Sequence, residues 1–164
     1  MTADLILGVD PGLKGALAFI DYLSGELVQW DDMPSWNVGG KPTVDEYSLA
    51  RLLDHMGPRV VEAWIEVPTP RPGQGVTGPA TSMRNYGLLR GLIIAQFIPL
   101  HEAPPATWKK AMGVLADKDD ARAAASKFWP GWSRDWSGKS QDGRAEAALI
   151  AAYGRRKHGL KAVA

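Results

Sequence analysis

The segment LILGVDPG, residues 5–12, runs from an apolar, partly β-branched stretch directly into an acid and a Pro-Gly turn. This pattern predicts a buried strand that ends at Asp10 and turns at Pro11-Gly12. An acid at the end of an apolar strand is costly to bury unless its charge is compensated. Asp10 is therefore either a ligand of a bound cation or the cap of its own turn, and its position alone leaves both open.

The sequence indicates four further strands after the first. The segments 15–21 and 26–33 lie at hairpin distance and, with the first strand, predict a three-stranded antiparallel meander. The apolar run 59–67, ended by Pro68, predicts a central strand covered on both faces. A last strand is expected over 97–101, before a pair of prolines.

Apolar residues at helical spacing predict four helices. The first covers 43–56, with Thr43 and Glu46 as a capping box. The others are expected from about 81 to 96, around 121–128, and from about 142 to 156. The tryptophans at 129, 132 and 136 lie in a predicted irregular loop and are interpreted as a packed lid. The order of elements predicts an α/β fold, a mixed five-stranded sheet flanked by helices on both faces.

Composition sets the class of protein. With 164 residues the chain is near the size of one domain, so we expect a single domain over 1–158 and a short tail over 159–164. Because there is no cysteine, disulfides and thiolate metal sites are excluded. The apolar stretch at 91–100 is about half of the roughly 20 residues that span a bilayer, and no signal-peptide pattern is seen, so a cytoplasmic protein without membrane contact is expected.

Three further acids extend the case that begins with Asp10. Glu66 also ends an apolar strand, as a metal ligand or as an ion-pair partner of a nearby arginine. Asp142 and Glu146 lie at i and i+4 on one face of the last helix, where acids also suit the helix dipole. Carboxylates without His or Cys partners suit Mg²⁺ or Mn²⁺, and two such ions roughly 4 Å apart can support phosphodiester hydrolysis.

Three blocks spread along the chain resemble RuvC-type Holliday junction resolvases: GVDPGLKGALAF at 8–19, AWIEVP at 63–68 and DGRAEAALIA at 142–151. The glycine-rich RPGQGVTG at 71–78 is most similar to divergent phage-type members. The resemblance implies an RNase H-like fold, a homodimer, two metal ions per site and four-way DNA junctions as substrate. The better-known bacterial members end with two Asp at i and i+3, so which of Asp142 and Glu146 binds metal directly stays open.

Polar and basic residues near the acids are candidates for DNA contact, because neutralising phosphates requires cations. Each basic residue taken alone is more often a solvated surface charge. The candidates are Lys14, Arg71, Gln74, Arg84, Lys109, Lys110 and Lys118. By analogy with the resembled family, the helix around 86–93 is the expected dimer interface.

The sequence thus predicts a metal-dependent, structure-selective endodeoxyribonuclease that cuts four-way junctions in a bacterial cell or a phage-infected host. Two alternatives remain at this point. One is an RNase H-like nuclease for another branched DNA or an RNA–DNA hybrid. The other is a nucleotide-binding module of the actin-like type, which needs a second similar domain for which 164 residues leave little room.

Overall fold

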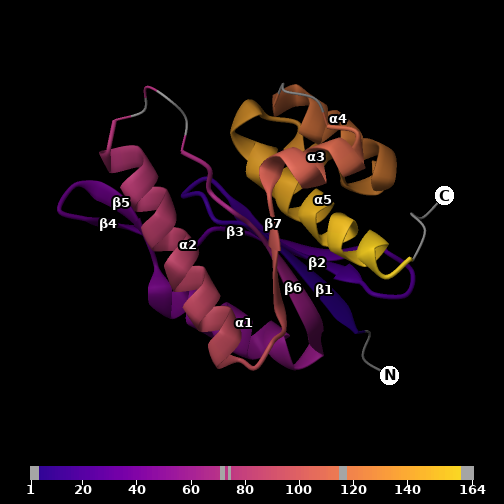
Figure 1. The fold of residues 1–164 in the computed structure, drawn as a ribbon, viewed down its shortest axis with the longest axis horizontal. Coiled ribbons are helices and arrows are strands. Elements are labelled where there is room, and N and C mark those ends of the chain that lie inside the picture. The colour runs from indigo at the N-terminus through magenta and orange to yellow at the C-terminus, as the bar shows by residue number, and fades with distance from the viewer. Residues whose placement is uncertain (1–3, 71–72, 74, 115–117, 160–164) are drawn as a thin grey trace.

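A computed structural model of the protein describes residues 4–70, 73, 75–114 and 118–159. Its centre is a five-stranded sheet in the order β3-β2-β1-β6-β7 (Figure 1). The meander consists of β1 (Leu5–Asp10), β2 (Ala16–Asp21) and β3 (Leu27–Asp32), all antiparallel. On the other side of β1, β6 (Val60–Glu66) and β7 (Leu100–Ala103) run parallel to it. The predicted mixed five-stranded sheet is confirmed.

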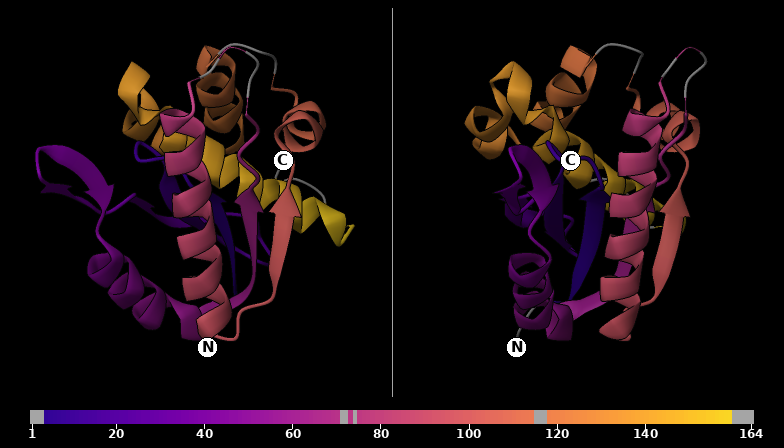
Figure 2. Two further views of the ribbon diagram at one scale, coloured as in Figure 1. Left: turned by 60° about the vertical axis from the view of Figure 1, so that its left-hand side comes forward. Right: turned by 90° about the vertical axis from the view of Figure 1, so that its left-hand side faces the viewer.

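Helices cover both faces of this sheet, as predicted (Figures 1 and 2). One face packs against α1 (Glu46–Met56) and α2 (Thr77–Ala95), and the other against α3 (Pro105–Met112), α4 (Lys118–Phe128) and α5 (Asp142–Lys157). Side chains of a strand alternate between faces, so Ile6 belongs to the core under α5 and Leu7 to the core under α1 and α2. Among the described residues, no helix is long and apolar enough to cross a membrane.

Glycines allow α5 to lie directly on the sheet. A Cβ atom on Gly8 of β1 would come within 2.1 Å of the carbonyl oxygen of Ala147. One on Gly143 would come within 2.3 Å of the carbonyl oxygen of Lys14, in the turn between β1 and β2. No larger residue fits at either position without moving the helix. The start of α5 is therefore held close to the end of β1.

Several predicted boundaries are wrong. The first helix begins at Glu46, because Asp45 caps it by accepting hydrogen bonds from the amides of Tyr47 and Ser48, each at 3.1 Å. Thr43 lies in a strand instead, so it does not form the expected capping box. The helix expected from about 81 begins at Thr77. The last strand begins at Leu100, after a reversal at Phe97 with a φ of 57°.

Some elements were not predicted. They are a hairpin of β4 (Ser35–Val38) and β5 (Lys41–Val44), the helix α3, and short 3-10 helices at Gly57–Arg59, Pro130–Trp136 and Lys139–Gln141. The tryptophan segment is thus a 3-10 helix and not an irregular loop. Its packed character is confirmed, because Trp129 and Trp136 are buried with ring centroids 6.4 Å apart, and Trp132 packs against the same core.

Candidate active site

Asp10 and Glu66 end neighbouring parallel strands. Val9 pairs with Ile65 in the β1–β6 ladder, so the next residue of each strand lies at the same edge of the sheet. Along each strand every second side chain shares a face. Ile6 and Trp64 belong to the core under α5, which places Asp10 and Glu66 on that face too. The two strand-end acids therefore meet beneath α5.

The first two turns of α5 bring the other two acids to the same place. Asp142 is the first residue of α5 and is buried, and the side chain of Glu146 is only 15% exposed. Gly143 packs on the backbone of Lys14 and Gly15, directly after β1, which fixes the start of the helix over Asp10. The predicted common face of Asp142 and Glu146 thus points into the protein and not into solvent.

The pKa of Asp10 reflects the nearness of the other three acids. Burial, followed by the negative charges of Glu146, Glu66 and Asp142, raises the pKa of Asp10 to about 7. A hydrogen bond from the amide of Gly12 to Oδ1, 3.0 Å long, acts in the opposite direction. Asp10 therefore caps its own turn, as one of the two interpretations of the sequence predicts, and is also a member of an acidic cluster.

Two residues of α3 contact the acids. The indole Nε1 of buried Trp108 donates a hydrogen bond to Oε2 of Glu66 at 2.7 Å. The ammonium of Lys109 donates to Oε1 of Glu146 at 2.9 Å. A side chain that bonds each glutamate restricts the rotamers of that glutamate. The role of Trp108 could not be predicted from local patterns, because the contact joins residues that are 42 positions apart.

A cavity of about 310 Å³ opens beside these acids. The end of β1, the end of β6, the loop after β6 and the first turns of α2 form its walls. Its lining residues are Asp10, Pro11, Gly12, Glu66, Pro68, Thr69, Pro70, Gly78, Pro79, Ser82 and Met83. The proline-rich segment that follows β6 is thus part of the wall of the site.

The candidate DNA-binding residues are placed differently from one another. Lys14 is exposed in the turn after β1, and Lys110 is exposed on α3. Arg84 lies on α2 and forms an exposed ion pair with Glu46 at 3.6 Å. Lys118 is the first residue of α4. Arg71 and Gln74 lie outside the described residues. Among these candidates, the position of Lys109 differs most from the expectation, because its ammonium contacts a predicted catalytic acid.

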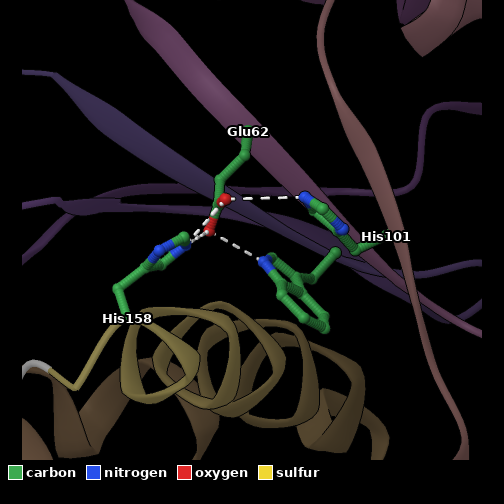
Figure 3. A network of polar contacts seen from close by, with 4 residues as sticks. Glu62, His101 and His158 are labelled. Carbon is green, nitrogen blue, oxygen red and sulfur yellow. Dashed lines mark hydrogen bonds and ion pairs between the residues drawn. The ribbon is translucent and has the colours of Figure 1, made fainter.

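A further acid of β6 belongs to a separate network (Figure 3). Glu62 lies on the same face as Glu66 but near the start of the strand. It accepts a hydrogen bond from Trp64 Nε1 at 2.8 Å. It also contacts Nε2 of His158 at 2.9 Å and Nε2 of His101 at 3.6 Å. These contacts tie the residue after α5 to β6 and β7. Glu62 is therefore part of the scaffold of the fold.

The four acids have the right donor atoms for a divalent cation, but their side chains are not yet arranged around one. All four candidates are carboxylates, the oxygen donors that Mg²⁺ and Mn²⁺ prefer. Burial and three neighbouring carboxylates raise the pKa of Asp10, so a bound cation would stabilise its charged form. Over residues 4–70, 73, 75–114 and 118–159, however, no group of three or more His, Asp or Glu side chains is arranged to hold a metal ion as it stands. Binding would therefore need small side-chain movements.

Comparison with solved structures identifies the fold. RuvC of Thermus thermophilus has a TM-score of 0.65 to this chain at 14% identity, and the match covers 96% of this chain and 99% of RuvC. RuvC from T. thermophilus in complex with a Holliday junction substrate has a TM-score of 0.68 at 14% identity, covering 97% and 99%. The chain has the RuvC fold. The RNase H-like architecture expected from the three sequence blocks is confirmed.

Sequence comparison points to the same group of proteins. The chain is 31% identical over 122 residues to a chloroplastic Holliday junction resolvase of Chlamydomonas reinhardtii. The match covers 71% of this chain but only 14% of that relative, so the chain spans a small part of the length of the curated protein that it matches. No family model matches the chain. The fold therefore confirms the resemblance to RuvC-type resolvases, and one related sequence supports it.

Proposed function

We propose that the protein is a metal-dependent endodeoxyribonuclease that resolves four-way (Holliday) DNA junctions by hydrolysing phosphodiester bonds. The observation that carries the proposal is the gathering of Asp10, Glu66, Asp142 and Glu146 around one point, reported by the raised pKa of Asp10. A related sequence is a Holliday junction resolvase, and a matching fold binds a Holliday junction substrate. We place the nuclease domain at 1–158, the tail at 159–164, and the protein in the cytoplasm.

The metal requirement follows from the donor set. We assign Asp10, Glu66, Asp142 and Glu146 as the residues that hold two Mg²⁺ ions, with Mn²⁺ as a possible substitute. Metal ions held there would supply activation of a water molecule and neutralisation of charge on the phosphate and the leaving oxygen. Removing one carboxylate leaves the remaining donors too few and too weakly charged to bind the ions at the same affinity.

The protein itself orients the proposed metal ligands. Trp108 fixes the orientation of Glu66, and Lys109 fixes that of Glu146 while balancing part of the negative charge. The cavity beside Asp10 and Glu66 is large enough to admit a phosphate group. Because its walls are rich in proline and glycine, few side chains need to move when a DNA backbone enters.

DNA binding is assigned to cations around this cavity. Lys14 is exposed in the turn after β1, and Lys110 is exposed on α3 next to Lys109, so we assign both to contacts with phosphates. Arg71, Gln74, Arg84, Lys109 and Lys118 remain in the proposed set from the sequence. Of these, Lys109 acts mainly on Glu146, and Arg84 must exchange its ion pair with Glu46 for a phosphate.

We also propose a homodimer, because two symmetric cuts in one junction are placed most simply by a two-fold enzyme. The helix predicted to form the interface is α2, but its residues Tyr86, Leu89 and Ile93 are buried in the core of the same chain. The exposed face of α2 carries Met83, Gly87, Gly91 and Ile94. A Cβ on either glycine would meet nothing within 4 Å, so a second helix has room to approach closely.

The dimer is tested with Ile94→Glu, which puts a charge on the proposed interface. Sedimentation should move from dimer to monomer, and junction cleavage should fall. The control is Leu23→Glu, at an exposed apolar position in the β2–β3 turn, which should stay dimeric. A wild-type protein that sediments as a monomer at micromolar concentration, with and without junction, contradicts the dimer.

The activity is tested with labelled four-way junction, duplex and RNA–DNA hybrid, each with Mg²⁺ or EDTA. We expect paired incisions in the junction with Mg²⁺ and none with EDTA. Preferential cutting of the hybrid would favour a ribonuclease H-type enzyme instead. Metal-independent cutting, or no cutting of any of the three substrates, would refute the proposed function.

A further inference from the structure

Three polar residues that are distant in the sequence meet near the start of β6 (Figure 3). Glu62 lies on β6, His101 lies on the neighbouring strand β7, and His158 directly follows the last residue of α5. Glu62 precedes Glu66 by four residues of the same strand, which is roughly 13 Å at the usual rise of about 3.3 Å per residue. The meeting point is therefore separate from the proposed active site.

The carboxylate of Glu62 is the buried centre of this group. Its side chain is only 8% exposed, and burying a carboxylate is costly unless its charge is compensated. In the part of the chain that the structure describes, its side-chain partners are the indole of Trp64 and the imidazoles of His101 and His158. An indole carries no charge, and an imidazole carries one only when it is protonated. Among the described residues, no permanent cation therefore contacts this carboxylate.

Both histidines present the same ring nitrogen to the same carboxylate oxygen. Nε2 of His158 lies 2.9 Å from Oε2 of Glu62, and Nε2 of His101 lies 3.6 Å from it. Nε2 of His158 is also 2.9 Å from Oε1, the oxygen to which Trp64 donates. Two ligand atoms of one tetrahedral Zn²⁺, each about 2.0–2.2 Å from the ion, lie about 3.4 Å apart. The distances of both imidazoles from the carboxylate are thus close to those of a zinc site.

Aromatic rings orient both imidazoles. His101 stacks on Trp64 with ring centroids 4.6 Å apart, and His158 packs against Tyr22 with centroids 5.8 Å apart. The two histidine side chains are 45% and 39% exposed, so an ion can reach them from solvent and water can complete its coordination. Within the described residues, no three His, Asp or Glu side chains already surround an ion, so binding must draw His101 toward the carboxylate.

We propose that Glu62, His101 and His158 form a second metal site, which takes Zn²⁺. Two imidazoles and a carboxylate suit zinc, whereas Mg²⁺ is bound mainly through oxygen donors. The ion joins β6 and β7 to the residue that follows α5, so its binding stabilises the folded chain. The site lies outside the acidic cluster and takes no part in cleavage, so it does not depend on the proposed function.

The test titrates Zn²⁺ into the untagged full chain at neutral pH in excess Mg²⁺, after bound metal has been removed with a chelator. Calorimetry of the wild-type protein should show a zinc site, and the midpoint of thermal unfolding should rise by about 5 to 10 °C when free Zn²⁺ exceeds Kd a hundredfold. His101→Gln and His158→Gln each keep a side-chain amide that can donate to Glu62, but each removes a zinc ligand. Each should raise Kd at least about a hundredfold.

The third histidine of the chain provides the matched control. His55 is exposed in the last turn of α1, and His55→Gln should change neither Kd nor the thermal shift. Asp10→Asn alters only the acidic cluster, so it should also retain the zinc site. Both proposed ligand variants should cut a four-way junction in Mg²⁺ at the rate of the wild-type protein, because neither residue contacts the acidic cluster.

Three results would overturn the zinc site. The first is an unchanged Kd in both His101→Gln and His158→Gln. The second is a zinc response that Asp10→Asn abolishes and both histidine variants keep, because the ion then lies among the catalytic acids. The third is a wild-type protein that neither binds Zn²⁺ nor gains thermal stability from it, which means that the two imidazoles only hydrogen-bond Glu62. Junction cleavage in Mg²⁺ is measured separately, so failure of the zinc site is distinguishable from failure of the proposed function.

Discussion

The indole nitrogen of Trp108 lies 2.7 Å from a carboxylate oxygen of Glu66 and links α3 to the end of β6. Trp108 is fully buried, so this donor cannot be replaced by water without a rearrangement. The protein itself thus holds one carboxylate oxygen of this strand-end acid. The position of Glu66 depends on a helix that follows it in sequence by about forty residues.

We expect Trp108→Phe to raise the Mg²⁺ concentration needed for half-maximal cleavage, because Glu66 loses the group that orients it. The variant should also lose about 1 to 3 kcal/mol of unfolding free energy from the smaller ring and the lost hydrogen bond. The control is Trp136→Phe, since Trp136 is equally buried but bonds Ser126 instead. A Mg²⁺ dependence that shifts equally in both variants would mean that Trp108 acts through stability alone.

Asp10→Asn should abolish cleavage by several orders of magnitude and leave junction binding intact. In EDTA it should also be at least as stable as the wild-type protein, because it removes a charge that burial and three neighbouring acids disfavour. The measurements are single-turnover cleavage rates and denaturant melts. Full Mg²⁺-dependent activity of this variant would refute the assignment of Asp10.

The same carboxyl gives a pH dependence in the metal-free protein. The pKa of Asp10 is about 7 in the folded chain against an ordinary value of 3.8, so the folded state binds a proton more tightly than the unfolded state between these values. The free energy of unfolding should therefore fall as pH rises from about 4 to about 7. Urea melts in EDTA across this range should show a shallower fall for Asp10→Asn than for the wild-type protein.

Glu62 and Glu66 offer a matched pair on one face of β6. Glu66→Gln should lose cleavage with little change in stability. Glu62→Gln should keep cleavage but unfold more easily, because the amide replaces a charge that Trp64 and His158 contact. Melting temperatures and cleavage rates of both variants, measured side by side, check the contrast. If Glu62→Gln were the inactive and stable variant, the functional and structural acids would be interchanged.

Substitutions of the two lysines of α3 should also have different effects, one on cleavage and the other on DNA binding. Lys109→Ala should lower the cleavage rate more than it weakens binding, since its ammonium contacts Glu146 at 2.9 Å. Lys110→Ala should weaken binding and reduce the log–log salt slope by about one unit, as expected for an exposed cation that neutralises a phosphate. Lys118→Ala is expected to resemble Lys110→Ala. Salt titrations that leave the slope unchanged for Lys110 and Lys118 would identify them as ordinary solvated charges.

The strands and the acids were predictable because they depend on local patterns. Alternation, the turn at Pro11-Gly12 and the helical spacing of Asp142 and Glu146 are readable over a few residues. The roles of Trp108 and Lys109 were not, because α3 is only eight residues long and its contacts reach distant strands. The hairpin had a signal, Gly39-Gly40 between two β-rich segments, that the longer helical pattern beginning at Thr43 obscured.

The close packing of α5 on Gly8 also matters while the chain is being synthesised. The first strand to be made contributes Asp10, whereas the helix that covers it is the last described element to leave the ribosome. A nascent or prematurely terminated chain that lacks α5 exposes the apolar face of β1 and β2 and carries only Asp10 and Glu66 of the acidic cluster. On the proposed function, chains without α5 lack Asp142 and Glu146, so the proposed cutting centre is complete only after synthesis has passed Glu146.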